Sequence, residues 1–138
     1  MILRIVIFGS DADSVDALNY ILSSRGYEVL CYGEPDMCPG YTGCFSYCSQ
    51  QNPCVDIVLV MSRMKRMTGL ELIRQQTNAG CKVLTINKVV ISGDFTSEDL
   101  QEAEKLGCRT LSKPLDINEL FNWLEERAGR IDPARKLA

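Results

Sequence analysis

The stretch Val55-Asp56-Ile57-Val58-Leu59-Val60-Met61 decides how this chain folds. It is a short, almost continuous apolar run rich in β-branched residues, which is typical of a strand buried on both faces. After a short loop, residues Thr68 to Asn78 predict a helix. A buried strand followed directly by a helix is the repeating unit of a parallel sheet.

The same alternation recurs on both sides of this unit. Four more strands are expected at Arg4–Phe8, Tyr27–Cys31, Lys88–Ser92 and Arg109–Ser112, with Val83–Ile86 as an extension of, or extended approach to, the strand at Lys88. Further helices are expected around Val15–Leu22, at Pro39–Gln51, through Leu100–Leu106 behind cap residues at Phe95–Asp99, and from Asp116 onward. The sequence therefore predicts an α/β fold, a single doubly wound domain around a five-stranded parallel sheet.

Length and composition suit one globular domain of 138 residues. We expect the domain to span residues 1–128, and residues 129–138, which are charged and contain Pro133, to be a flexible tail or the start of a linker. A net charge of -3 gives no general attraction to nucleic acid or anionic lipid. No stretch resembles an export signal or membrane span, so we expect a cytoplasmic protein whose partners are proteins.

Histidine is absent from the chain, and this excludes several kinds of chemistry. Serine and cysteine nucleophiles activated by histidine, and zinc sites that contain histidine, all need an imidazole. The seven cysteines form an odd set in a chain expected to be cytoplasmic, which favours reduced thiols over a disulfide framework.

The loop and helix start after Met61 carry a recognisable motif. Met64, Met67, Gly69 and Glu71 fall at the spacing found around the phosphorylation site of bacterial response-regulator receiver domains. From Leu3 to Leu124 the chain resembles that family. The resemblance implies the flavodoxin-like receiver fold, (βα)5, and a cis peptide bond at Lys113-Pro114.

The same resemblance identifies a phosphorylation pocket at the carboxyl ends of the strands, with key groups replaced. Gly9 and Ser10 stand where the family has two acids that hold magnesium, and Met61 stands where it has the acceptor aspartate. Ser92 and Lys113 match the hydroxyl and lysine that contact the phosphoryl group. Thr110 stands where the family has a switching aromatic residue.

These departures predict a pseudo-receiver, a non-enzymatic signalling domain of the two-component type that needs no cofactor and no magnesium. By analogy with the family, it would bind a protein partner or a second copy through its fourth helix, fifth strand and fifth helix. One alternative is a true phosphorelay receiver with a non-standard acceptor, for which Asp11 is the carboxylate nearest to the lost pair.

Two further alternatives rest on unusual segments. The basic residues Arg63, Lys65, Arg66 and Lys113 could invert the sign of the pocket and bind an anion, although a basic loop is usually a solvated surface. The cysteine-rich insert 31–54 could be a redox sensor or hold zinc or an iron-sulfur cluster. Its weak candidate ligands are Cys38, Cys44, Cys48 and Cys54. Cysteine acting as a small buried hydrophobe is the simpler interpretation.

Overall fold

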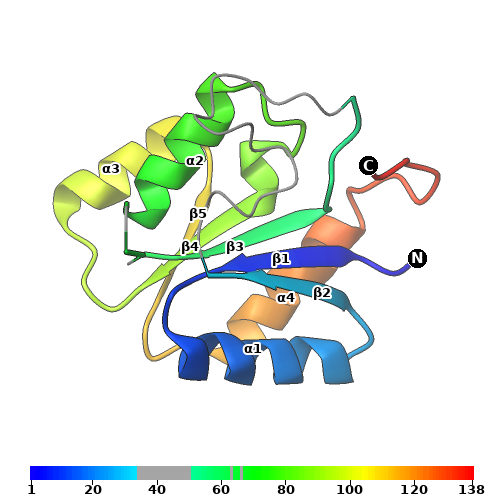
Figure 1. The fold of residues 1–138 in the computed structure, drawn as a ribbon, viewed down its shortest axis with the longest axis horizontal. Helices are drawn as coiled ribbons and strands as arrows, with labels where there is room; N and C mark the ends of the chain where they lie inside the picture. Colours follow the sequence, from blue (N-terminus) through cyan, green and yellow to red (C-terminus); the bar gives the residue numbers. More distant parts are fainter. Residues whose placement is uncertain (34–50, 63, 66) are drawn as a thin grey trace.

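A single parallel sheet forms the centre of the molecule (Figure 1). The computed structural model describes residues 1–33, 51–62, 64–65 and 67–138. The strands are β1 (Arg4–Phe8), β2 (Glu28–Tyr32), β3 (Ile57–Met61), β4 (Lys88–Ser92) and β5 (Arg109–Ser112), in the order β2-β1-β3-β4-β5. All neighbouring strands pair in parallel. The predicted five-stranded parallel α/β fold is confirmed.

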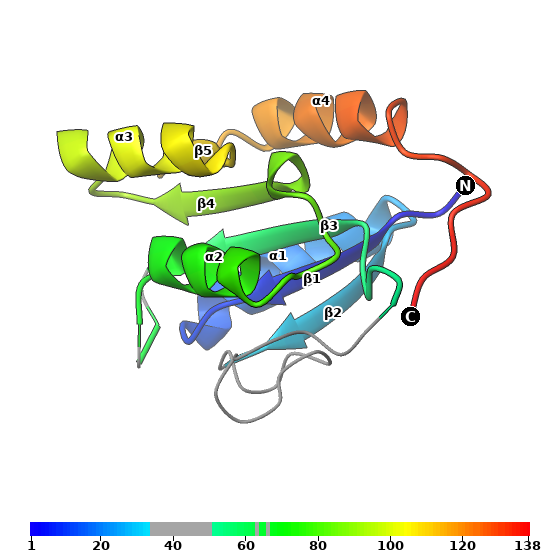
Figure 2. The ribbon, with the colours of Figure 1, turned by 90° about the horizontal axis from the view of Figure 1, so that it is seen from above.

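Helices cover both faces of the sheet, as Figure 2 shows. They are α1 (Ala12–Ser24), α2 (Gly69–Asn78), α3 (Ser97–Leu106) and α4 (Ile117–Ala128). Helices α1 and α4 lie on one face, and α2 and α3 lie on the other (Figure 1). The helix expected at Pro39–Gln51 lies almost entirely outside the described residues.

The core has two halves because successive side chains of a buried strand point to opposite faces. In β1, Ile5 and Ile7 pack with α1 and α4, whereas Val6 and Phe8 pack with α2 and α3. Every residue of β3 and β4 is buried. This burial explains why the two strands are nearly continuous apolar runs in the sequence.

Local signals in the sequence fix most helix ends. The Thr96 hydroxyl accepts from the Asp99 amide at 3.1 Å, and the Asp99 carboxylate accepts from the Thr96 amide at 3.0 Å, so α3 begins with a complete capping box. The Asp116 carboxylate likewise accepts from the first-turn amides of α4. Both predicted caps are confirmed.

Several boundaries differ from the expectation; β2, for example, lies one residue later than Tyr27–Cys31. Residues 83–86 do not extend β4, because Thr85–Asn87 form a short 3-10 helix in which the Asn87 amide donates to the Leu84 carbonyl. Strand β3 begins at Ile57, two residues later than expected, because one carboxylate oxygen of Asp56 accepts from the first amide of β1.

The C-terminal residues lie against the sheet. Figures 1 and 2 show that the chain turns back after α4, so that the two ends of the chain lie on the same side of the molecule. Arg135 forms an ion pair with Asp56, and the Ala138 amide donates to the Pro53 carbonyl at 2.8 Å. Part of the segment expected to be a flexible tail or the start of a linker therefore contacts the sheet. The sequence alone does not show that Asp56 faces the returning chain.

Candidate functional site

The carboxyl ends of four strands converge on one edge of the sheet, which is where parallel α/β folds place their ligands. Strand β1 leads to Gly9, Ser10 and Asp11, β3 ends at Met61, β4 ends at Ser92, and β5 leads to Lys113. The edge is held by backbone hydrogen bonds, including those from the Gly9 amide to Tyr32 and from the Lys113 amide to Ser92. The peptide bond Lys113-Pro114 is cis, as expected.

A hollow of about 380 Å³ lies at this edge. We call it the strand-end hollow, and its lining residues are Ser10, Asp11, Met61, Ser62, Gly93, Asp94 and Lys113. Four of the six pocket residues predicted from the sequence therefore line one cavity. Ser92 lines an adjoining hollow of about 230 Å³, which shares Ser62 and Asp94 with the first.

Gly9 lies beneath the Met61 side chain. A Cβ atom placed on Gly9 would lie 2.6 Å from Met61 Cγ, 3.2 Å from Met61 Cβ and 3.0 Å from a methyl group of Val15. Atoms that are not bonded do not approach so closely in a packed interior, so no larger residue fits at position 9 while Met61 keeps this position. The residues that can occupy positions 9 and 61 are thus structurally linked.

The Ser92 hydroxyl is engaged in a local turn. It donates to Asp94 Oδ1 at 2.8 Å and accepts from the Asp94 amide at 3.1 Å, and Ser92 itself is only 3% exposed. This pair gives Ser92 a structural role in addition to its place in the motif. Asp94 was missed by the sequence reasoning, although its position two residues after a strand-end serine is typical of such turns.

Asp11 is held by its own helix. Its carboxylate accepts from the Ser14 hydroxyl at 2.8 Å, in the first turn of α1. This hydrogen bond is the main reason that the pKa of Asp11 lies below its ordinary value, and the charge of Lys113 contributes less. No hydrogen bond joins Asp11 to Lys113, although both residues line the hollow.

The described residues that line the hollow carry more acidic than basic groups. Among the described lining residues, Asp11 and Asp94 contribute two carboxylates and Lys113 one ammonium group. Lys65 is exposed and does not line the hollow, and Arg63 and Arg66 lie outside the described residues. The part of the site that the structure describes therefore gives no support for an inverted sign.

An apolar groove of about 280 Å³ adjoins the strand-end hollow and shares Met61 and Lys113 with it. Its other walls come from α1 and from the segment between β5 and α4, and they include Leu18, Ile21 and Ile117. Met61, which is 6% exposed, separates the polar hollow from this apolar groove. An acidic side chain at position 61 would place a negative charge against the apolar groove.

The side chains present do not fit the magnesium site that the receiver fold implies. Mg²⁺ is held by carboxylates, carbonyl groups and water, whereas Gly9 and Ser10 offer no carboxylate and Met61 offers a thioether. Among residues 1–33, 51–62, 64–65 and 67–138, no group of three or more cysteine or acidic residues is placed to hold a metal ion.

Of the remaining candidate residues, the described Thr110 and Cys54 do not line the strand-end hollow. Thr110 is half-buried on β5, opposite Val90 of β4, and offers no aromatic ring for a switch. Of the four cysteines proposed as weak ligands, Cys38, Cys44 and Cys48 lie outside the described residues, and the half-buried Cys54 packs against the core beneath α2 and α3.

Comparisons with known proteins identify the fold. No protein-family model and no curated protein matches the chain. Solved structures do match it along almost its whole length. A response regulator receiver protein from Pseudomonas putida is 22% identical with a TM-score of 0.73, and covers 91% of this chain and 98% of its own.

Two further receiver structures agree. A two-component response regulator from Clostridium difficile is 18% identical with a TM-score of 0.71, and covers 93% of this chain and 97% of its own. The signal receiver domain of a modulated diguanylate cyclase from Desulfovibrio desulfuricans G20 is 20% identical with a TM-score of 0.71, and covers 94% of this chain and 96% of its own. At these identities the likeness establishes that the chain has the receiver fold.

None of the helices in the described part of the chain is both long and apolar enough to cross a membrane.

Proposed function

We propose that this chain is a signal-transduction domain of the two-component receiver type that is not phosphorylated and acts through protein contacts. The observation that carries the proposal is that Met61, which stands where the receiver motif has its acceptor aspartate, packs over Gly9. A thioether cannot accept a phosphoryl group as a carboxylate does. The bulk of Met61 also fills the space that an acidic side chain at position 9 would need.

The proposed contact surface consists of α3, β5 and α4, which are the fourth helix, fifth strand and fifth helix of the sequence analysis. Leu100 on α3 is 47% exposed, and α3 also carries Glu98, Asp99 and Lys105. On the same proposed surface, Arg109 of β5 and Glu119 of α4 form an exposed ion pair at 3.4 Å. An apolar residue near charged groups is a common composition for a protein interface.

Incubation with acetyl phosphate and Mg²⁺, followed by intact-mass measurement, tests the proposal. We expect the mass to remain that of the unmodified chain. A receiver domain with its acid pair and acceptor aspartate in place serves as the positive control under the same conditions. A stoichiometric phosphoryl adduct on this chain would overturn the proposal.

Two variants would locate such an adduct. Asp11 and Asp94 are the carboxylates of the strand-end hollow, so Asp11→Asn and Asp94→Asn would each remove one possible acceptor. Loss of the adduct in one variant alone would identify the acceptor and favour the alternative of a true receiver with a non-standard site.

A further inference from the structure

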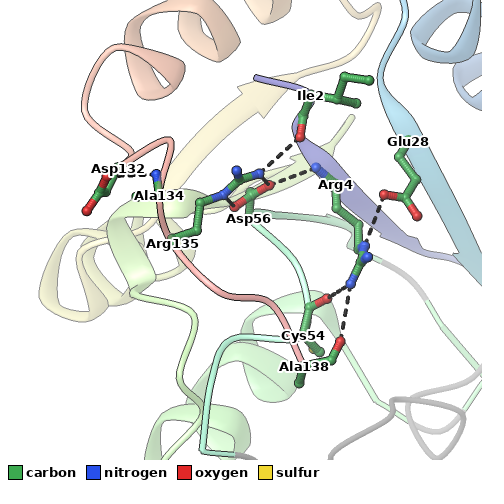
Figure 3. A network of polar contacts seen from close by, with 9 residues as sticks. All are labelled: Ile2, Arg4, Glu28, Cys54, Asp56, Asp132, Ala134, Arg135 and Ala138. Atoms are coloured by element: carbon green, nitrogen blue, oxygen red, sulfur yellow. Dashed lines mark hydrogen bonds and ion pairs between the residues drawn. The ribbon is translucent and has the colours of Figure 1, made fainter.

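Residues 130–138 cross the amino-terminal end of the sheet, opposite the strand-end hollow (Figure 3). They begin after α4 and turn at Asp132-Pro133-Ala134-Arg135, where the Arg135 amide donates to the Asp132 carbonyl at 3.0 Å. The Asp132 carboxylate also accepts from the Ala134 amide at 2.8 Å. Aspartate at the first position and proline at the second are favoured in such a turn, so the turn itself holds Arg135 in place.

Arg135 is directed at a buried carboxylate. Its Nε donates to Asp56 Oδ1 at 2.8 Å and one Nη to Asp56 Oδ2 at 2.6 Å, while the same Nη donates to the Ile2 carbonyl at 3.0 Å. The Asp56 side chain is only 2% exposed, and that of Arg135 is 21% exposed. A paired, desolvated contact of this geometry differs from an ordinary surface ion pair.

Asp56 is also fixed from the sheet. Its Oδ2 accepts from the Arg4 amide and its own amide donates to the Arg4 carbonyl, both at 2.8 Å. The carboxylate therefore joins the first residue of β1, the approach to β3 and the returning chain.

A second contact holds the last residue. The Ala138 amide donates to the Pro53 carbonyl at 2.8 Å, and the Ala138 carbonyl accepts from the Arg4 side chain at 3.2 Å. The same guanidinium donates to the Cys54 carbonyl and pairs with Glu28 of β2 (Figure 3). Arg4 and Arg135 thus connect residues 130–138 with three segments of the sheet edge.

We propose that residues 130–138 form a latch, which opens and closes as one unit over the amino-terminal end of the sheet and is held by Arg135 and Asp56. Arg135 lies in the latch, and its guanidinium covers the Asp56 carboxylate. When the latch lifts, water reaches the Asp56 carboxylate and replaces Arg135 as its hydrogen-bond partner. The latch can therefore open locally while the strands remain paired.

Amide hydrogen exchange of the full chain, followed by NMR, tests the latch. In the unmodified chain we expect the Arg135 and Ala138 amides to be protected and to exchange with one common opening equilibrium. In Arg135→Gln we expect both to exchange faster by roughly tenfold or more, with strand amides such as those of Ile7 and Leu59 unchanged. In Arg135→Lys the increase should be smaller, because lysine keeps the charge but cannot bind both carboxylate oxygens as a fork.

Arg130→Gln is the matched control. Arg130 lies in the same segment, is exposed and forms no side-chain hydrogen bond or ion pair with the described residues, so its replacement should leave the exchange of Arg135 and Ala138 unchanged. The measurement on the unmodified chain is decisive even if a variant fails to fold. Exchange of the two amides at unprotected rates, or at independent rates, would overturn the proposal.

Discussion

Gly9 and Met61 compete for one volume at the carboxyl ends of β1 and β3. With Met61 Cγ only 2.6 Å from the position of a Cβ at residue 9, an added methyl group must displace Met61 or Val15. We expect Gly9→Ala to lower the free energy of unfolding by about 1–3 kcal/mol through overpacking. Urea denaturation measures this change.

The double variant separates overpacking from other effects of residue 9. Met61→Ala alone should destabilise by about 2–5 kcal/mol, since it removes a buried side chain. Gly9→Ala combined with Met61→Ala should cost less than the sum of the two, by about 1 kcal/mol or more, because the shortest contact, with Met61 Cγ, is removed. Simple additivity would show that the two positions are not linked.

Residue identity allowed part of the candidate site to be predicted. The sequence itself shows that glycine occupies position 9 and methionine position 61. It does not show their contact, because that depends on how close β1 and β3 bring the two residues. The hydrogen bond from Ser14 to Asp11 and the turn between Ser92 and Asp94 also depend on local geometry. The same sequence motif does not require either contact, so neither could be predicted from it.

At the level of elements, one buried polar contact joins α2 to β4. Lys88 has no exposed surface and Gln76 is 3% exposed, and Lys88 Nζ donates to Gln76 Oε1 at 2.8 Å. Among the described residues, the Lys88 side chain forms this hydrogen bond and no other. The sequence analysis treated Lys88 only as the first residue of a strand, because the partner on the neighbouring helix cannot be identified from spacing.

Replacing one or both partners tests what this contact contributes. Gln76→Leu should lower the free energy of unfolding by about 1–3 kcal/mol or more, since it leaves the buried Lys88 amine without its acceptor. Lys88→Met together with Gln76→Leu should be close to neutral or stabilising, because neither polar group then needs a partner. Thermal or urea unfolding measures both, and a double variant less stable than Gln76→Leu would contradict this account.

Element types could be predicted more fully than element ends. Strand β4 and strand β5 have the bounds that the apolar runs predict, and α3 begins at its capping box. Those signals act within a few residues. The start of β3 instead depends on Asp56 bonding to Arg4, which is 52 residues away, and the 3-10 helix at Thr85–Asn87 follows from how the chain enters β4.

At the scale of the whole molecule, the two ends of the sheet carry different groups. The carboxyl end carries the strand-end hollow, which is lined by Asp11, Met61, Asp94 and Lys113 among others. The amino end carries the Asp56 network, and it was not anticipated because Arg135 and Asp56 are 79 residues apart. The alternation of strands and helices predicted the fold, since each unit is a local pattern, whereas contacts between the ends of the chain leave no periodic signal.

The seven cysteines are the remaining whole-molecule question, and their placement argues against a shared site among those described. Cys31 lies on edge strand β2, and Cys108 directly precedes the opposite edge strand β5. Four strand spacings separate these edges, or roughly 19 Å, which exceeds the reach of one metal ion. Burial raises the pKa of both thiols, which keeps them protonated and lowers their reactivity.

A native mass spectrum of anaerobically purified protein therefore discriminates between the interpretations. We expect the mass of the bare polypeptide, as a monomer or a dimer, because Cys54, Cys81 and Cys108 pack as small hydrophobic residues against the core beneath α2 and α3. A spectrum of a sample treated with a chelator should be the same. A mass increment of zinc or an iron-sulfur cluster that the chelator removes would instead place the function in the insert 31–54, since the described residues group no three ligands around a metal.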